Sequence, residues 1–172
     1  MSDITVVDEN DLVVGQGDYR EVRRTGKRHR VSAVVLFNSK REVLLQLRSQ
    51  HVHEAPGKWD VSAGGHVDPG EGYHDAVVKE LREELGLTGL EITQMGKTYD
   101  EFREAEEWIR RFGMTHMAVT DKPVQIEPEE VASVRWVSIE ELGDWIDREP
   151  DELTRGMKAV FRLYLKPMIA RS

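Results

Sequence analysis

The sequence contains no cysteine among its 172 residues. This absence excludes disulfide bonds, thiolate zinc sites, iron–sulfur clusters and cysteine nucleophiles. No apolar run approaches the roughly 18 residues needed to span a bilayer, so no membrane partner is expected. The start, Met1-Ser2-Asp3, has no basic segment followed by an apolar run, so no signal peptide is predicted and a cytoplasmic location is expected.

Positive charge is also scarce. The chain has 24 Lys and Arg against 32 Asp and Glu, a formal net charge of -8. Nucleic-acid polymers and anionic membranes reward basic patches, so neither is expected as the main partner. Hydrophobic residues make up 39% and charged residues 33%, which indicates a globular chain, and the length predicts a single domain over 1–172.

Short β-branched runs alternate with turn residues along the chain. The first 30 residues are interpreted as a hairpin followed by a charged lead-in loop over 19–30. Val31–Phe37 is the clearest buried strand, and Val43–Leu47 returns as its partner. Further strands are expected at 59–62, 90–99, 113–120 and 131–137, and helices at 73–85, from Ser138 onward and at 151–165. This order predicts a mixed sheet covered by helices.

The helix predicted at 73–85 places three carboxylates together. At about 100° per residue, separations of three and four residues bring Glu80, Glu83 and Glu84 onto one stripe. Each like-charge pair at this spacing costs a few tenths of a kcal/mol, and a hard divalent cation would offset the repulsion directly. The neighbouring stripe is apolar and is expected to face the core, with Val77, Val78, Leu81 and Leu85.

A glycine-rich loop over 64–72 precedes this helix. Acidic clusters on helices are usually solvated, so the three glutamates alone would indicate little. The glycines let the backbone approach an anion or a metal closely, and Glu71 adds another carboxylate at the helix entry. Gly86 stands where a left-handed residue would end the helix.

This stretch, residues 65–87, resembles the Nudix box, whose pattern is G-x5-E-x7-R-E-U-x-E-E-x-G-U with U aliphatic. The pattern is matched by Gly65, Glu71, Glu80, Leu81, Glu83, Glu84, Gly86 and Leu87, while Lys79 stands in place of the arginine. The resemblance extends over about 31–142. It implies a Nudix-type α/β/α sandwich with a mixed sheet and a loop–helix–loop metal-binding box. It also implies a Nudix hydrolase, a pyrophosphatase that cleaves a diphosphate linkage in a nucleoside-diphosphate-linked small molecule.

The resemblance further implies a magnesium or manganese cofactor. Glu80, Glu83 and Glu84 would be metal ligands, joined by the Gly65 carbonyl. Glu71 would be a structural brace paired with position 79. Lys79 can pair with Glu71 as a point charge, but it cannot form the two-pronged contact of an arginine.

The general base stays open among Glu83, Glu84 and Glu130, the last from the acidic loop that also holds Glu127 and Glu129. Arg48, in the sequence LLQLRS, is placed to bind a substrate phosphate. Substrate specificity is expected in two loops, 51–58 and 100–111. A homodimer would agree with the commonest oligomeric state.

Two other functions share this fold. Isopentenyl-diphosphate isomerase places metal histidines where His29 and His66 stand, but it needs a cysteine at the position of Gly64. Its second essential acid would fall near 110–113, and residues 108–117 contain no acid. The other alternative is a catalytically inactive Nudix-fold binding module. Such modules usually lose box carboxylates, and all of them are kept here.

Overall fold

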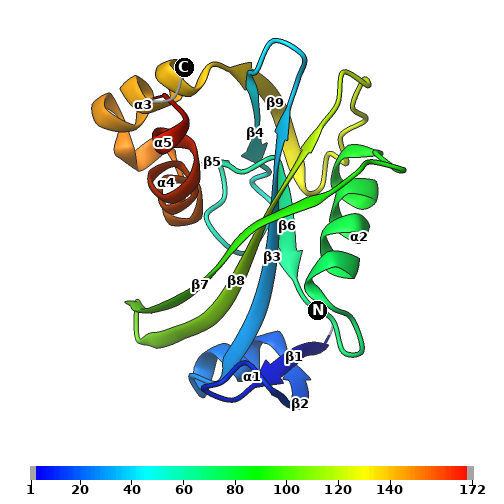
Figure 1. Ribbon diagram of the computed structural model, residues 1–172. Helices are drawn as coiled ribbons and strands as arrows, with labels where there is room; N and C mark the ends of the chain where they lie inside the picture. The colour runs from blue at the N-terminus through cyan, green and yellow to red at the C-terminus, as the bar shows by residue number, and fades with distance from the viewer. Residues whose placement is uncertain (1–2, 170–172) are drawn as a thin grey trace.

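The computed structural model describes residues 3–169, so Met1 and Ser2, part of the start that lacks a signal-peptide pattern, lie outside the described residues. A mixed sheet lies between helix α2 (Tyr73–Leu85) on one side and the helices from α3 (Ile139–Arg148) to α5 (Lys166–Ile169) on the other (Figure 1). The predicted α/β/α sandwich is therefore confirmed. Across residues 3–169, no helix is long and apolar enough to cross a membrane.

Strand β3 (Arg28–Phe37) organises the sheet. It pairs in parallel with β8 (Glu107–Val119) over its whole length and antiparallel with β6 (Ala63–His66). Most of the predicted loop at 64–72 is irregular, but its first residues belong to β6. On the side away from β8, β4 (Val43–Arg48) pairs antiparallel with the end of β3. It also pairs antiparallel with β5 (Trp59–Asp60) and β9 (Val131–Val137).

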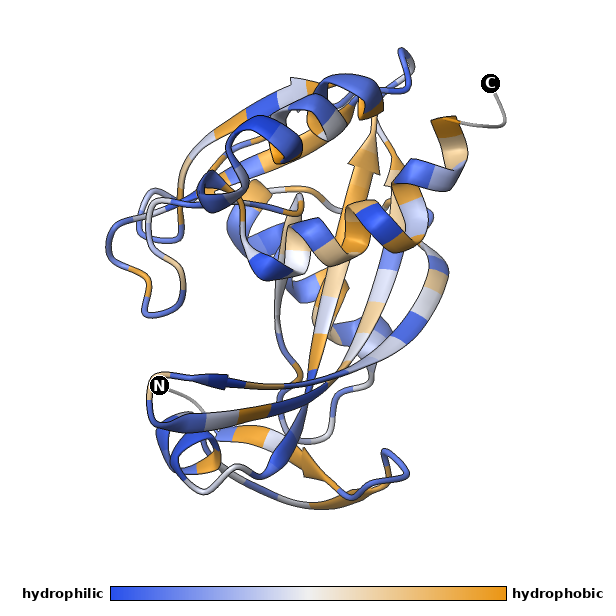
Figure 2. Cartoon of the chain, turned by 90° about the vertical axis from the view of Figure 1, so that its left-hand side faces the viewer, coloured by the Kyte–Doolittle hydropathy of each residue, from blue (hydrophilic) through white to orange (hydrophobic). Residues whose placement is uncertain are grey.

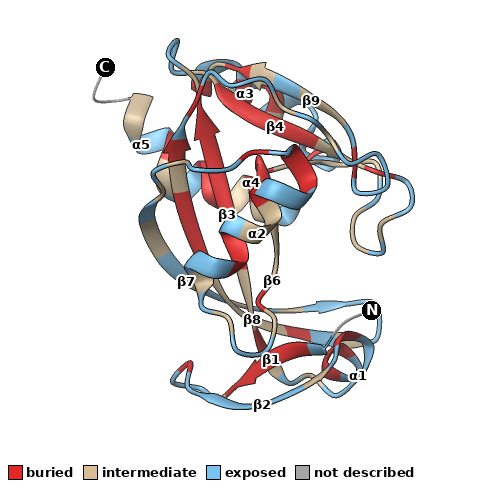
Figure 3. Ribbon diagram, turned by 90° about the vertical axis from the view of Figure 1, so that its right-hand side faces the viewer, coloured by how far each residue is buried: buried red, intermediate tan, exposed pale blue. Residues whose placement is uncertain are grey.

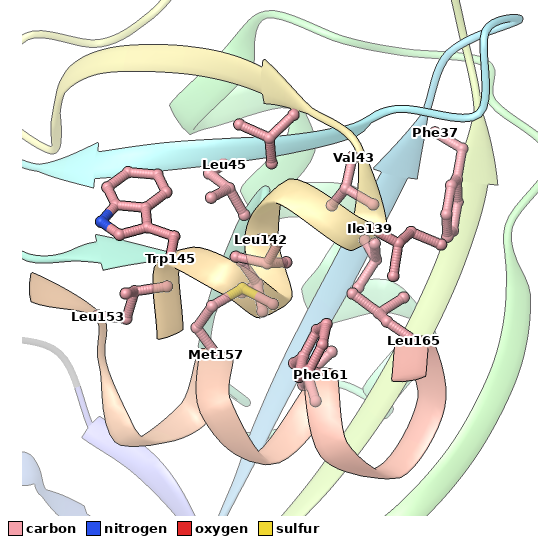
Figure 4. Packing of buried hydrophobic residues seen from close by; sticks show 14 residues of the cluster. Phe37, Val43, Leu45, Ile139, Leu142, Trp145, Leu153, Met157, Phe161 and Leu165 are labelled. Carbon is pink, nitrogen blue, oxygen red and sulfur yellow. The ribbon is translucent and has the colours of Figure 1, made fainter. Parts of the chain in front are cut away.

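The alternation of side chains along β3 builds two separate cores. Val34 and Leu36 pack with the apolar face of α2 (Tyr73–Leu85). Val35 and Phe37 point the other way, into a cluster with α3 and the C-terminal helices, shown in Figure 4. The strands β3 and β4 are accordingly the most continuously buried part of the sheet (Figure 3).

The C-terminal helix starts later than predicted. Pro150–Glu152 forms a 3-10 turn, and α4 (Arg155–Val160) begins only after Thr154, whose hydroxyl accepts a hydrogen bond from the Met157 amide at 3.0 Å. The Thr154 side chain is thus the N-terminal cap of α4, and the sequence prediction did not include it. The helix continues as a π-turn over Phe161–Leu165 and as α5 (Lys166–Ile169), while α3 spans Ile139–Arg148 after its predicted cap Ser138.

The N-terminal lead-in is more ordered than predicted. The hairpin of β1 (Asp3–Val7) and β2 (Val13–Asp18) is confirmed, but the loop expected at 19–30 contains a helix, α1 (Tyr19–Arg24). Tyr19 and Val22, three residues apart on this helix, are both buried against the hairpin. Asp18 caps its first turn.

The expectation of a loop over 100–111 was wrong. These residues belong to β7 (Thr93–Glu104) and β8, which form a long antiparallel arm turning at 105–106. Hydrophilic residues cover much of this arm in Figure 2. Their charge suggests a loop, but β8 is stabilised by its parallel pairing with β3. The local sequence does not predict this long-range pairing.

Candidate active site

A cleft with a volume of about 1130 Å³ opens on the α4 side of the sheet. Above it, the core cluster of α3 and α4 covers the sheet, whereas the lower part of β3 extends beyond these helices (Figure 1). The box loop and α2 border one end of the cleft, and the β7–β8 arm borders the other. The cleft is large enough to enclose a nucleotide-sized ligand.

Helix α2 begins and ends where the sequence predicts. The backbone N–H of Gly72 donates to Asp75 Oδ2 at 3.0 Å, which satisfies an orphan donor at the first turn. Gly86 ends the helix with φ 66°, a conformation that favours glycine. One residue was assigned to the wrong face: Val78 is 42% exposed rather than buried. Glu84 takes part in the buried surface of the helix instead.

Two box carboxylates converge on the loop strand β6. Glu84 is 5% exposed, and its Oε2 accepts from the Gly64 N–H at 3.1 Å and from Gln46 Nε2 at 3.3 Å. Glu80 lies so close to Gly65 that a side chain there would collide with its carboxylate. Glycine at position 65 therefore allows helix and loop to meet.

The electrostatics of this pair fit a cation site. Burial raises the pKa of Glu80 to about 7, with Glu83 and Glu130 raising it further against the opposing charge of Lys79. Burial and the neighbouring Glu80 raise the pKa of Glu84 to about 8. Buried carboxylates that repel one another are stabilised by a hard divalent ion, and carboxylate and carbonyl oxygens are the ligands that magnesium prefers. The residues present therefore fit the expected metal.

Glu83 is not gathered with the other two. Its side chain is 52% exposed and accepts from Arg82 at 2.8 Å. Accordingly, within residues 3–169, no group of three or more acidic or histidine side chains is already arranged around one metal position. A rotation of the exposed Glu83 side chain would be needed to complete the predicted set.

Lys79 lies against the loop, as the brace requires. Its Nζ is 3.3 Å from Glu71 Oε2 and only 2.6 Å from Asp68 Oδ2. Glu71 in turn accepts from the Asp68 N–H at 3.3 Å. The sequence does not predict the contact with Asp68, although it is the shorter of the two. Lys79 therefore contacts two loop carboxylates through one ammonium group, whereas an arginine would make a bidentate contact with one carboxylate.

Arg48 and Glu130 also border the cleft. The Nε of Arg48 donates to the Glu54 carbonyl at 2.9 Å, and its Nη1 is 3.5 Å from Asp60 Oδ2. Arg48 lowers the pKa of Glu84, so its positive charge reaches the box. Glu130, together with Glu127 and Glu129, places carboxylates on the same wall of the cleft.

A second polar cluster lies toward the arm. The rings of His29 and His66 are 5.3 Å apart between centroids. Burial lowers the pKa of His29 to about 3 and that of His66 to about 4, so both are neutral at pH 7. Glu54 approaches them, held by the Tyr19 hydroxyl and by Arg23 at 3.0 Å. No sequence motif identifies Glu54 or Arg23.

Gly64 has no room for the side chain that an isomerase would need. A Cβ added there would lie 2.8 Å from the Ser32 carbonyl oxygen, closer than real Cβ contacts allow. Position 111, in the segment where the isomerase places its second acid, carries an arginine that faces the cleft. Proton donors for carbocation chemistry are thus missing at both positions.

Comparison with known proteins identifies the family of the chain. The model of the NUDIX domain matches residues 27–163. An uncharacterized Nudix hydrolase of Yersinia pestis is 33% identical over 151 residues, covering 87% of this chain and 81% of that protein. An isopentenyl-diphosphate Delta-isomerase of Pectobacterium atrosepticum is 30% identical over 161 residues, covering 94% and 90%.

Among solved structures, DR0079 from Deinococcus radiodurans superposes with a TM-score of 0.78 at 26% identity, covering 95% of this chain and 99% of that one. The family match spans the box, the cleft and most of the sheet. The chain belongs to the Nudix hydrolase family, whose members are enzymes that act on pyrophosphate bonds.

Proposed function

We propose that the protein hydrolyses a diphosphate linkage in a nucleoside-diphosphate-linked small molecule, with magnesium or manganese as cofactor. The observation that carries this proposal is the convergence of half-buried Glu80 on Gly65 and of buried Glu84 on Gly64, at one end of a nucleotide-sized cleft. Glu80, Glu83, Glu84 and the Gly65 carbonyl would hold the cation, which supplies charge neutralisation to the diphosphate oxygens.

The chain's own residues would then perform the proton and phosphate chemistry. Arg48 binds a diphosphate oxygen and helps to offset its charge. A water adds to one phosphorus, the bridging P–O bond breaks, and the water proton passes to a carboxylate. Glu83, Glu84 and Glu130 are the three candidates for that carboxylate, because all of them line the cleft at the box end.

The proposal is tested with a panel of nucleotide sugars, dinucleotide cofactors and nucleoside di- and triphosphates, each assayed with magnesium, manganese and chelator. We expect metal-dependent release of phosphate-containing products from at least one compound class. The double variant Glu83→Gln/Glu84→Gln should abolish turnover without unfolding the protein. The matched control Glu140→Gln, at an exposed position of α3, should retain it.

Two outcomes would contradict the proposal. Full turnover by the double variant would show that the box carboxylates do not carry the chemistry. Binding of magnesium and nucleotides without any turnover would favour a binding module. Single variants at the three carboxylates, compared by their kcat, then identify the base, since its loss should lower kcat far more than KM.

A further inference from the structure

We propose that Arg111 forms a second anion-binding subsite in the cleft. This subsite binds a phosphate monoester or carboxylate at a part of the substrate distant from the scissile diphosphate. The inference rests on the proposed function, because the diphosphate at the box defines the other end of the substrate. It narrows the substrate class to diphosphates with an additional anionic group.

The guanidinium of Arg111 has no hydrogen-bond acceptor among the described residues. Its Nε is buried without a partner, and the side chain as a whole is 17% exposed. Its ion pair with Asp100 is 3.8 Å long, beyond hydrogen-bond distance. A largely buried cation without an acceptor is costly, so an acceptor supplied by a ligand would relieve that cost.

The other two cationic side chains of the cleft serve its box end, where Arg48 is the proposed ligand of the scissile diphosphate. Among the described residues, the basic lining consists of Arg48, Lys79 and Arg111. Arg48 donates to a backbone carbonyl, and Lys79 joins two carboxylates of the box loop. Arg111 lies over the Phe102 ring at 5.6 Å, but among the described residues it is the lining cation that donates no hydrogen bond.

Strand register places Arg111 on the cleft floor. Arg111 pairs with His29 of β3, while Gly65 of the box pairs with Ser32. Three residues of strand separate the two positions, roughly 10 Å along the strand direction. Next along the same face of β8 stands Gly113, whose lack of a side chain keeps the floor low beside the guanidinium.

Nearby carboxylates do not remove the need for a ligand. Glu54 is held by the Tyr19 hydroxyl and by Arg23, and although the charge of Arg111 also helps to lower the pKa of Glu54, Arg111 donates no hydrogen bond to it. Asp100 is one-third exposed and retains water as a partner. The buried Nε2 of His66, on β6 at the other side of β3, also lacks a partner, so this end of the cleft has a second unmet polar atom. Both observations indicate a polar ligand at the arm end.

The test uses pairs of diphosphates that differ by one distal anion. The pairs are NADP+ with NAD+, coenzyme A with dephospho-coenzyme A, and UDP-glucuronic acid with UDP-glucose, which separates a phosphate from a carboxylate. Affinities are measured by calorimetry with magnesium and with chelator. We expect the anionic member of at least one pair to bind on the order of tenfold tighter, the effect of one charge-assisted hydrogen bond.

Arg111→Met should abolish this preference, because it keeps an unbranched apolar stem and removes the charge. Arg103→Met is the matched control, since Arg103 lies at the tip of the same arm and pairs with Glu106 at 3.2 Å. It should leave the preference unchanged. Thermal melting of each variant shows that the fold is intact.

Asp100→Asn gives a result of opposite sign. Removing the competing carboxylate should strengthen binding of the anionic member by a few-fold, which a purely structural Arg111 would not produce. Equal affinities within every pair for the wild type, or a preference that survives Arg111→Met, would overturn the inference. Because binding is measured apart from hydrolysis, absence of turnover would count against the proposed function and leave this result to stand on its own.

Discussion

Arg23 holds three parts of the chain together, and its replacement should be costly. It lies on α1 with a side chain that is 7% exposed. It contacts Glu54 of the cleft loop at 3.0 Å, and Glu104 and Glu107 of the β7–β8 arm at 2.7 and 2.9 Å. Its Nη1 also donates to the Tyr19 hydroxyl at 2.8 Å. We predict that Arg23→Met destabilises the protein substantially.

The magnitude follows from exposure. Glu104 and Glu107 are 57% and 38% exposed, so each of those pairs contributes about 0–1 kcal/mol. The contacts to the less exposed Glu54 and to the buried Tyr19 form in a drier environment, where hydrogen bonds to charged groups contribute about 1.5–3 kcal/mol. The freed carboxylates can regain water, which limits the loss. A total of about 2–4 kcal/mol is expected in the free energy of unfolding.

Urea denaturation measures this loss. With a slope of about 2 kcal/mol per molar, the midpoint should fall by about 1–2 M at unchanged slope. The matched control is Arg24→Met, because Arg24 is the next residue of the same helix and is exposed. Its midpoint should stay within the scatter of the wild type. Equal midpoints for the two variants would refute the assignment of Arg23 as the link between α1, the cleft loop and the arm.

Three further changes test the packing, the box helix and the buried histidine. Leu142→Ala, at a fully buried position of the α3 core, should lower the free energy of unfolding by about 2–5 kcal/mol in the same assay. Gly86→Ala should cost about 1–2 kcal/mol, because φ is 66° and the new Cβ would lie 3.0 Å from Gln125; an unchanged midpoint would contradict the left-handed cap. The folded pKa of His29 is about 3, below its value of about 6.5 when unfolded, so its contribution is present above pH 6.5 and is lost as pH falls toward 3. In urea titrations from pH 7.5 to 4.5, His29→Gln should therefore lose stability less steeply than the wild type, and parallel curves would show that His29 does not titrate in this way.

The sequence predicts those features that arise within a short stretch of chain. The helix at 73–85 has the right bounds because its apolar spacing, the Asp75 contact at its start and Gly86 at its end all act locally. Strand β9 also has the predicted bounds, 131–137. The family pattern likewise identifies Glu80 and Glu84, which the fold brings together on the loop strand.

The features that the sequence does not predict depend on contacts between distant residues. Helix α1 has only six residues, too few to be stable alone, and its order comes from packing on the hairpin and from Arg23. The charged strands of the arm resemble a loop until β8 pairs with β3. The buried, unpartnered Nε of Arg111 depends on the folded surroundings of the side chain, so the sequence does not predict it. Glu83 illustrates the reverse case: helical periodicity groups it with Glu84, yet its exposed side chain turns to Arg82.

The two faces of β3 have a consequence for how such an enzyme can change its substrate. Val34 and Leu36 pack under α2, while Val31 and Ala33 line the cleft. Substitutions at positions 31 and 33 can reshape the ligand surface while the core beneath α2 keeps its side chains. A single-residue insertion in β3 would instead exchange the two sets, exposing Val34 and Leu36 to the ligand side. Adaptation to new diphosphates should therefore proceed by replacement along this strand and tolerate changes of length only in the loops around it.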